Sequence, residues 1–281
     1  MRDDGVMARC RMTHEVCVDH NRSLVVKRFR SWERGEPARE WAALTLLDEF
    51  APGLAPAPVG SDLDGDPPAI VMSWLPGAQL GTMAPLSAAQ IDALALALER
   101  LWHSVPPSRI SARMGPALNS AALTSQVRAM LAAEAGLGED PVVGRAWQAG
   151  VTWLSEHATD PQASSDGAMV LGQGDCNLAN FLWDGRVVRI VDFEDSGLSD
   201  RVFELAILVE HISAWSDTSL VADNVVGVFD LTNSERSRLR EFRRLAALFW
   251  LILLLPDGPA SDRNPPGTVA RQARRLLSLL G

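Results

Sequence analysis

An aspartate, an asparagine five residues later and a second aspartate after an apolar run carry the clearest chemical pattern in the 281 residues of the chain. Asp175 and Asn180 lie in the segment GQGDCNLAN, and Asp192 follows the strand-like residues VVRIV. Transfer of a phosphoryl group to a hydroxyl requires a carboxylate that accepts the hydroxyl proton, together with an amide oxygen and a second carboxylate that hold Mg²⁺ against the phosphates. Taken singly, each of these residues also fits a turn or the end of a strand. Taken together and in this order, they favour phosphoryl transfer, with Asp175 as the candidate base and Asn180 and Asp192 as candidate metal ligands.

The basic residues indicate a phosphate-binding lysine. Of the 26 basic residues only Lys27 is a lysine, and the others are arginines. In that background a lysine in the strand-like run LVVKRF marks a position that arginine does not replace, which favours a functional lysine over an exposed one. A predicted helix that contains Glu40 follows this strand, with Glu36 just before it, and a lysine held by a helix glutamate contacts the α- and β-phosphates in kinases. Glu40 is the preferred partner because it lies inside the predicted helix, whereas Glu36 lies just before Pro37.

The hydrophobic pattern predicts a small β-rich layer followed by a mainly helical region. Alternation and turn residues predict strands at 13–18, 23–29 and 69–75, and a helix at 37–50. Helical spacing predicts later helices at 87–105, 120–135, 141–157, 201–215, 234–255 and 269–280. Two short strands are expected around 168–175 and 187–193, with 181–186 as the turn between them. The expected fold class is therefore α+β, with residues 1–75 as one lobe and residues 76–281 as the other.

The chain resembles the aminoglycoside phosphotransferase and choline kinase-like small-molecule kinases, which are relatives of the protein kinases. GDCNLANFLW resembles their catalytic loop and IVDFEDSGLSDRVFELA their metal loop with the following helix. VVKRF resembles their lysine strand, REWAAL the helix that pairs with it, IVMSWLPG the hinge between lobes, and THEV the nucleotide loop. The resemblance implies a bilobal, protein-kinase-like fold and a reaction that uses ATP or GTP with Mg²⁺.

The resemblance also implies roles for individual residues. Asp175 would be the catalytic base, Asn180 and Asp192 the Mg²⁺ ligands, and Lys27, held by Glu40, the phosphate contact. Nucleotide contacts would further come from the backbone at the hinge, from apolar side chains and from one hydroxyl: Ser73, Trp74, Leu75, Val25, Met72 and Thr13. Asp200 would cap a helix, and Glu204 would support the catalytic loop.

Two departures from the family pattern leave an alternative open. Gln173 stands two residues before Asp175, where the family usually has histidine, and the segment ARCRMTHE contains no glycine at the expected nucleotide loop. Both features fit an active kinase, and both also fit a nucleotide-binding pseudokinase.

The net charge and the lack of an apolar targeting segment limit which partners and which location the sequence predicts. A formal charge of −9 and a pI near 5.1 exclude a general nucleic-acid binder and suit a cationic acceptor. The expected acceptor is a small-molecule hydroxyl, first an aminoglycoside or related cationic antibiotic, as in a resistance enzyme, and alternatively an amino-alcohol or a sugar. Candidate pocket carboxylates are Glu194, Asp195, Glu210 and Asp217. We expect a cytoplasmic location with neither a membrane anchor nor an obligate protein partner, because there is no apolar signal core and the longest apolar run, 245–255, is too short to span a bilayer.

Overall fold

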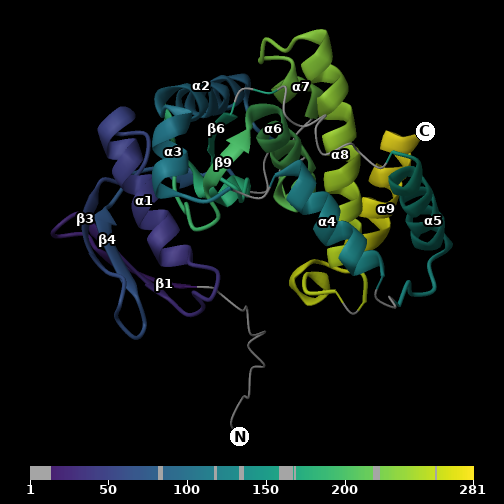
Figure 1. Cartoon of the computed structure of the whole chain (residues 1–281), viewed down its shortest axis with the longest axis horizontal. Coiled ribbons are helices and arrows are strands. Elements are labelled where there is room, and N and C mark those ends of the chain that lie inside the picture. The colour runs from purple at the N-terminus through teal and green to yellow at the C-terminus, as the bar shows by residue number, and fades with distance from the viewer. Residues whose placement is uncertain are drawn as a thin grey trace, which may run out of the picture.

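The computed structural model describes residues 14–81, 85–116, 119–132, 136–157, 167, 169–217, 222–256 and 258–281, although the side chains of residues 216, 217 and 262 are left out. Thr13, the candidate hydroxyl of the nucleotide loop, lies outside the described residues. A four-stranded sheet and helix α1 form one end of the molecule, and helices build most of the rest (Figure 1).

The first sheet is antiparallel in the order β1-β2-β4-β3. Its strands are β1 (His14–Asp19), β2 (Leu24–Phe29), β3 (Pro58–Asp62) and β4 (Ala69–Ser73). Because side chains alternate along a strand, Lys27 and Phe29 share one face of β2, and both are buried. Lys27 opposes Val16 of β1 and Ile70 of β4, so it occupies a central strand whose register is set on both sides.

Helix α1 (Glu36–Phe50) covers this sheet beside β3 and β4. Pro37 sits in its first turn, where the missing N–H costs nothing. Leu44 and Leu47 are buried one turn apart, which fixes the rotation of the helix. Glu40 lies one turn before Leu44 and is therefore carried on the covered side as well.

The remaining helices pack around one apolar core. They are α2 (Ala88–Ser104), α3 (Pro107–Arg113), α4 (Ser120–Leu131), α5 (Pro141–Glu156), α6 (Arg201–Glu210), α7 (Ala222–Val226), α8 (Asn233–Leu253) and α9 (Thr268–Leu280). Helix α8 runs between α6 and α9, and α5 packs on α9 (Figure 1). Ser87 begins α2 with a capping box that Gln90 completes, as a serine before an apolar-periodic run predicts.

The short strands differ from their predicted arrangement. Residues 181–186 were expected as a turn, but Phe181–Trp183 form β7, which pairs with β8 (Val188–Ile190) and with β5 (Ala78–Gln79). The turn is only residues 184–187. Strand β6 (Met169–Gly172) pairs instead with β9 (Gly197–Asp200), which was not predicted. These pairs place the two chemical loops, after β6 and after β8, beside each other.

The helix predicted for 201–215 is also shorter than expected. Helix α6 ends at Glu210, His211 leaves the helical conformation, and a separate π-helical turn covers Ser213–Asp217. Helices α3 and α7 were not predicted. Most of the apolar run 245–255 lies in the second half of α8, which ends at Leu253, and most of its side chains are buried. No helix in the described parts of the chain has the length and apolar character needed to cross a membrane.

Candidate active site

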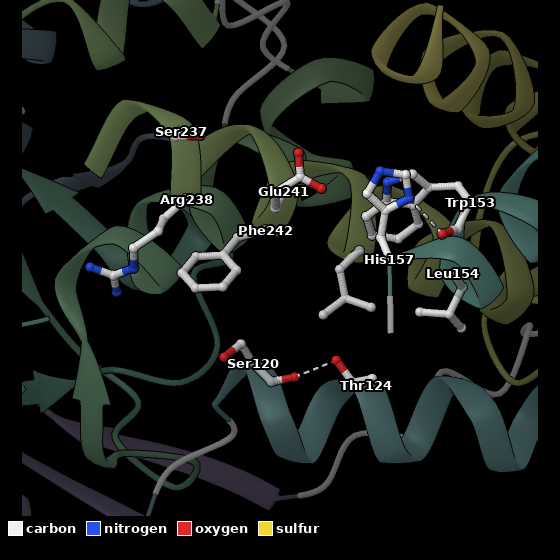
Figure 2. Close-up of a pocket in the computed structure, with 10 residues that line it drawn as sticks. Ser120, Thr124, Trp153, Leu154, His157, Ser237, Arg238, Glu241 and Phe242 are labelled. Carbon is white, nitrogen blue, oxygen red and sulfur yellow. Dashed lines mark hydrogen bonds between the residues drawn. The ribbon is translucent and has the colours of Figure 1, made fainter. Parts of the chain in front are cut away.

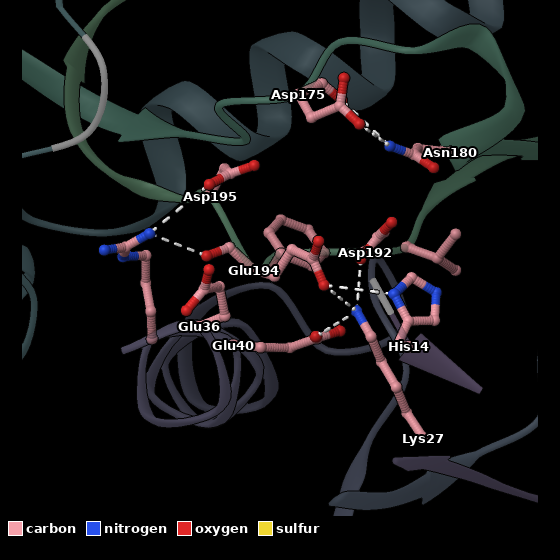
Figure 3. A network of polar contacts seen from close by, with 12 residues as sticks. His14, Lys27, Glu36, Glu40, Asp175, Asn180, Asp192, Glu194 and Asp195 are labelled. Carbon is pink, nitrogen blue, oxygen red and sulfur yellow. Dashed lines mark hydrogen bonds and ion pairs between the residues drawn. The ribbon is translucent and has the colours of Figure 1, made fainter. Parts of the chain in front are cut away.

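Lys27 stands at the centre of a cluster of three carboxylates (Figure 3). Its Nζ atom lies 2.6 Å from Glu40 Oε2, 2.5 Å from Asp192 Oδ1 and 3.0 Å from Glu194 Oε2. The contact with Glu40 joins β2 to α1, and the contact with Asp192 joins the first sheet to the loop after β8. Glu36 instead accepts hydrogen bonds from Arg34, so the structure pairs Lys27 with Glu40 and not with Glu36.

The cluster fixes the charge of the lysine. Burial opposes a charged ammonium group, but Glu40, Asp192 and Glu194 together outweigh it and raise the pKa of Lys27 well above its usual value. Burial also raises the pKa of Glu40, although the lysine opposes that shift. The pKa of Glu194 is instead lowered to about 2, because His14 and Lys27 together outweigh the effect of burial. Lys27 is therefore a fixed positive charge at neutral pH.

Asp175 lies on the loop after β6, opposite the lysine cluster (Figure 3). Asn180 donates from Nδ2 to the backbone oxygen of Asp175 at 3.0 Å and to Oδ2 of the same residue at 3.3 Å. Desolvation, joined by the charges of Asp192 and Asp195, raises the pKa of Asp175 to about 7. A carboxylate that titrates near neutral pH is suited to accept a proton.

The loop that carries Asp175 is built on a buried carboxylate. Glu204 Oε2 accepts the N–H groups of Gln173 at 3.0 Å and Gly174 at 3.3 Å, and its Oε1 accepts the hydroxyl of Ser199 at 2.7 Å. Gly174 has φ +83°, and an added Cβ would overlap the backbone oxygen of Asp195. Glycine and Glu204 together therefore set the direction in which Asp175 leaves the strand.

Gln173 connects the two chemical loops. It is fully buried, and its Nε2 donates to the backbone oxygen of Asp192 at 2.7 Å. Its Oε1 has no hydrogen-bond partner among the described residues. Asp192 itself has φ +65°, in the left-handed region that aspartate tolerates better than most residues. The amide of Gln173 thus braces an unusual backbone conformation at the residue whose carboxylate meets Lys27.

The cavity that we call the Lys27 cleft has a volume of about 470 Å³. It is lined by most of the residues that the sequence predicted for a nucleotide: Val25, Lys27, Glu40, Met72, Ser73, Trp74, Leu75, Asn180 and Asp192. The N–H groups of Ser73 and Trp74 already donate to Ala57 and Ser23. In the described part of the chain no hydrogen bond uses the N–H of Leu75, which leaves that group for a ligand.

His14 was not predicted as a site residue. It lines the Lys27 cleft, and its Nδ1 lies 3.3 Å from Glu194 Oε2. Within the described residues, ligand atoms of His14, Asp192 and Glu194 lie within 4.8 Å of one another, which is close enough to share a cation. Nothing in the sequence spacing indicates this group, because His14 is 178 positions from Asp192.

A second cavity, the Asp175 pocket, has a volume of about 520 Å³. Its polar lining comprises Arg34, Arg39, Asn119, Gln126, Asp175, Asp195 and His211. Its apolar wall includes Ile207, Phe249, Trp250 and Leu253. Of the described residues predicted to act in catalysis, metal binding or nucleotide binding, only Asp175 lines this pocket.

The predicted pocket carboxylates do not gather in the Asp175 pocket. Glu210 is fully buried and is held by Arg243 at 2.7 Å and Arg275 at 2.5 Å, so it is structural. Glu194 belongs to the lysine cluster. Asp195 does line the pocket, but it is paired with Arg34 at 3.1 Å and with Arg39 at 3.6 Å. Arg34 lies just before α1, and Arg39 lies in α1. The side chain of Asp217 lies outside the described residues.

A third pocket, between α4, α5 and α8, is separate from this chemistry (Figure 2). It measures about 130 Å³ and is lined by residues such as Thr124, Trp153 and Phe242. None of the predicted site residues lies in it. The candidate active site is therefore the Lys27 cleft together with the Asp175 pocket. A hydrogen bond from Asn180, which lines the cleft, to Asp175, which lines the pocket, links the two cavities.

Comparison with known proteins identifies a family for most of the chain. A family model described as the phosphotransferase enzyme family matches residues 15–242. None of the curated proteins matches the sequence.

Three solved structures illustrate the structural similarity. A choline/ethanolamine kinase family protein from Mesorhizobium loti has 17% identity and a TM-score of 0.61, over 92% of this chain and 82% of that chain. The GDP and kanamycin complex of the aminoglycoside phosphotransferase APH(2″)-IIIa has 16% identity and a TM-score of 0.64, over 95% and 89%. The complex of APH(3″)-Id from Streptomyces rimosus with ADP and streptomycin has 19% identity and a TM-score of 0.56, over 84% and 90%. At these identities the similarity shows the fold, which is the bilobal, protein-kinase-like α+β fold that the sequence predicts.

Proposed function

The chain belongs to the phosphotransferase enzyme family, and we propose that it transfers the terminal phosphoryl group of ATP or GTP to a hydroxyl group of a small molecule. The observation that carries the proposal is the position of Lys27, which is held by Glu40 and Asp192 in one cavity while Asp175 opens into the next. A kinase site needs this separation, because nucleotide and acceptor approach the reacting phosphorus from opposite sides.

Asn180 and Asp192 have the donor atoms that Mg²⁺ requires. The amide nitrogen of Asn180 is turned to Asp175, which leaves its carbonyl oxygen, and Lys27 contacts only Oδ1 of Asp192. Two hard oxygens from the protein suffice for this ion when the nucleotide phosphates supply others. When bound, Mg²⁺ neutralises charge on the phosphates.

The chain's own groups perform the rest of the proposed reaction. Lys27 binds the α- and β-phosphates. Asp175 accepts the proton of the acceptor hydroxyl as the hydroxyl oxygen attacks the terminal phosphorus. The bond from that phosphorus to the bridging oxygen of the β-phosphate breaks, and the nucleoside diphosphate leaves. Because the pKa of Asp175 is about 7, a large fraction of this carboxyl group is ionised at neutral pH and can accept the proton.

The nucleotide base is proposed to lie against Val25 and Met72, with the N–H of Leu75 donating to its edge. The N–H groups of Ser73 and Trp74 are used inside the chain, so these residues would contribute carbonyl groups and surface. Both ATP and GTP remain candidates because a backbone contact distinguishes them poorly. We place the boundary between the nucleotide lobe, 1–75, and the catalytic and acceptor lobe, 76–281, at this hinge.

An aminoglycoside or related cationic antibiotic is the first acceptor class to test. Two of the similar structures hold kanamycin and streptomycin, and the chain carries a formal charge of −9. Resistance to such a compound would then be the biological role.

The Asp175 pocket supports a second acceptor class. Among its described residues the carboxylates are Asp175 and Asp195, and the latter is already paired with Arg34 and Arg39. A hydroxyl compound without several positive charges, such as a sugar or a mono-amino alcohol, meets less unfavourable charge there.

Turnover of MgATP and MgGTP against a panel of aminoglycosides, choline, amino-alcohols and sugars tests the proposal, with phosphate adducts detected by mass spectrometry. We expect one acceptor to gain about 80 Da for each phosphate added, which is the mass of an HPO₃ group. Asp175→Asn should abolish transfer while nucleotide binding, measured by calorimetry, is retained. Binding of nucleotide without hydrolysis or transfer to any acceptor would instead support the pseudokinase alternative.

A further inference from the structure

His211 lies at the end of α6, where the chain leaves the helix, and faces Asp175 across the Asp175 pocket. Its Nε2 atom is 3.5 Å from Asp175 Oδ1. The ring is buried and packs edge-on against Trp250 of α8, with 4.8 Å between ring centroids. No sequence motif singles out this histidine, because it reaches the catalytic loop from 36 residues away.

The hydrogen bonds around His211 define which nitrogen carries the proton. The backbone N–H of Ser213 lies 3.1 Å from Nδ1, and an N–H group can only donate, so Nδ1 is an acceptor. The Ser213 hydroxyl lies 2.7 Å from the same nitrogen. A neutral ring with an accepting Nδ1 carries its single proton on Nε2, the atom that faces Asp175.

The ring is neutral in the folded protein. Burial lowers the pKa of His211 to about 4. A neutral imidazole can donate a hydrogen bond to the carboxylate without placing a positive charge beside it.

The same network ties His211 to the catalytic loop. Ser213 Oγ accepts the backbone N–H of Leu178 at 2.9 Å, and Leu178 lies between Asp175 and Asn180. These hydrogen bonds fix the position of the His211 ring relative to Ser213 and the loop that carries Asp175.

We propose that His211 is a positioning residue for Asp175: its Nε2–H holds Oδ1 of the carboxylate while Asn180 Nδ2 holds Oδ2, so that the base keeps one orientation toward the acceptor. This inference rests on the proposed phosphotransfer. The 3.5 Å separation shortens to a full hydrogen bond with a shift of a few tenths of an ångström, as catalytic contacts do when substrate binds. Gln173, at the position where the family usually has histidine, braces the Asp192 backbone, whereas His211 contacts the base from just after the end of α6.

A spectroscopic test examines the contact without relying on activity. Nitrogen-15 spectra of the histidine side chains at pH 7, with the His211 signals assigned by their loss in His211→Gln, should show a neutral ring protonated at Nε2. Asp175→Ala should shift the Nε2–H signal of His211, whereas His103→Gln, at an exposed histidine, should leave it unchanged. A ring protonated at Nδ1, or a signal that ignores Asp175→Ala, overturns the proposal.

A kinetic test distinguishes positioning from a structural role. His211→Leu should lower kcat for MgATP turnover about tenfold, with water or the identified acceptor, and leave KM for MgATP within about twofold. His211→Gln places an amide N–H near the Nε2 position and should recover most of kcat.

Two kinetic outcomes overturn the inference: an unchanged kcat in His211→Leu, or a loss of kcat in His211→Gln as large as that in His211→Leu. Thermal unfolding of each variant identifies a loss that comes from misfolding. If the wild-type protein turns over no nucleotide, the proposed function fails, and the spectra still decide whether His211 donates to Asp175.

Discussion

The Nζ atom of Lys27 lies 2.6 Å from Oε2 of Glu40, and both side chains are almost completely buried. A buried pair of this kind holds the strand and the helix in one relative position. Removing one partner of the pair leaves the other as a lone buried charge. A lone buried charge lowers the stability of the folded protein far more than the loss of one contact does.

Replacing Lys27 with methionine should lower the free energy of unfolding by about 3 kcal/mol, because Glu40, Asp192 and Glu194 are left without their shared cation. Urea unfolding followed by tryptophan fluorescence measures the loss. The double variant Lys27→Met/Glu40→Gln removes the most buried carboxylate and should regain part of it. Equal stability of the single and double variants would show that the stranded Glu40 charge is not the cause.

Gly174→Ala should disrupt the catalytic loop, because the added methyl group meets the backbone oxygen of Asp195 at a residue with φ +83°. Gly185→Ala is the matched control, since Gly185 has φ +98° but open space around it. We expect a cost of about 1 kcal/mol for the control, from backbone strain alone, and a clearly larger one for Gly174→Ala. Similar melting temperatures for the two variants would contradict the predicted collision.

Glu204→Ala should loosen the residues before Asp175. The amides of Gln173 and Gly174 lose their acceptor, and the expected destabilisation is about 3 kcal/mol for the unpaired buried donors. Hydrogen exchange at these two amides should accelerate. Glu235→Ala, which removes the capping box of α8, is a control with an expected cost of about 1 kcal/mol and no change in exchange near Asp175.

Acid should destabilise the wild-type protein relative to His211→Gln. In the unfolded chain His211 takes a proton near its ordinary pKa of 6.5, whereas burial in the folded protein lowers that pKa to about 4. The unfolded state therefore binds more protons between these values, and stability falls as the pH drops from 7 to 4, by up to about 3 kcal/mol from this residue. Urea unfolding of both proteins across this range measures the difference. Parallel curves would indicate that His211 is charged or exposed in the folded state, and His103→Gln should follow the wild type.

The larger elements could be predicted because their sequence patterns are local. Leu44 and Leu47 specify the covered face of α1, and Ser87 marks the start of α2. The short strands could not be predicted, because Phe181–Trp183 and Gly197–Asp200 are held by partners that lie elsewhere in the chain. A three-residue strand has little propensity of its own, so pairing decides its conformation.

The same distinction applies to the site. Asp175, Asn180 and Asp192 could be proposed from their residue types and spacing, and Lys27 from the rarity of lysine in the chain. Arg39, His14 and His211 were not predicted as site residues, because each acts across a gap of 36 to 180 residues. Composition also suggested an acidic acceptor pocket, whereas Glu210 and Asp195 proved to be matched by arginines.

The lysine cluster has one positive and three negative groups, so it carries a net charge of about −2 when all four are ionised. Its surplus of negative charge repels a bare triphosphate and attracts one that arrives already complexed with a divalent cation. We therefore predict that the cluster favours binding of the metal–nucleotide complex over binding of the free nucleotide. Calorimetric titration with nucleotide in chelator should give much weaker binding than titration with its magnesium complex, and equal affinities would show that the three carboxylates exert no such selection.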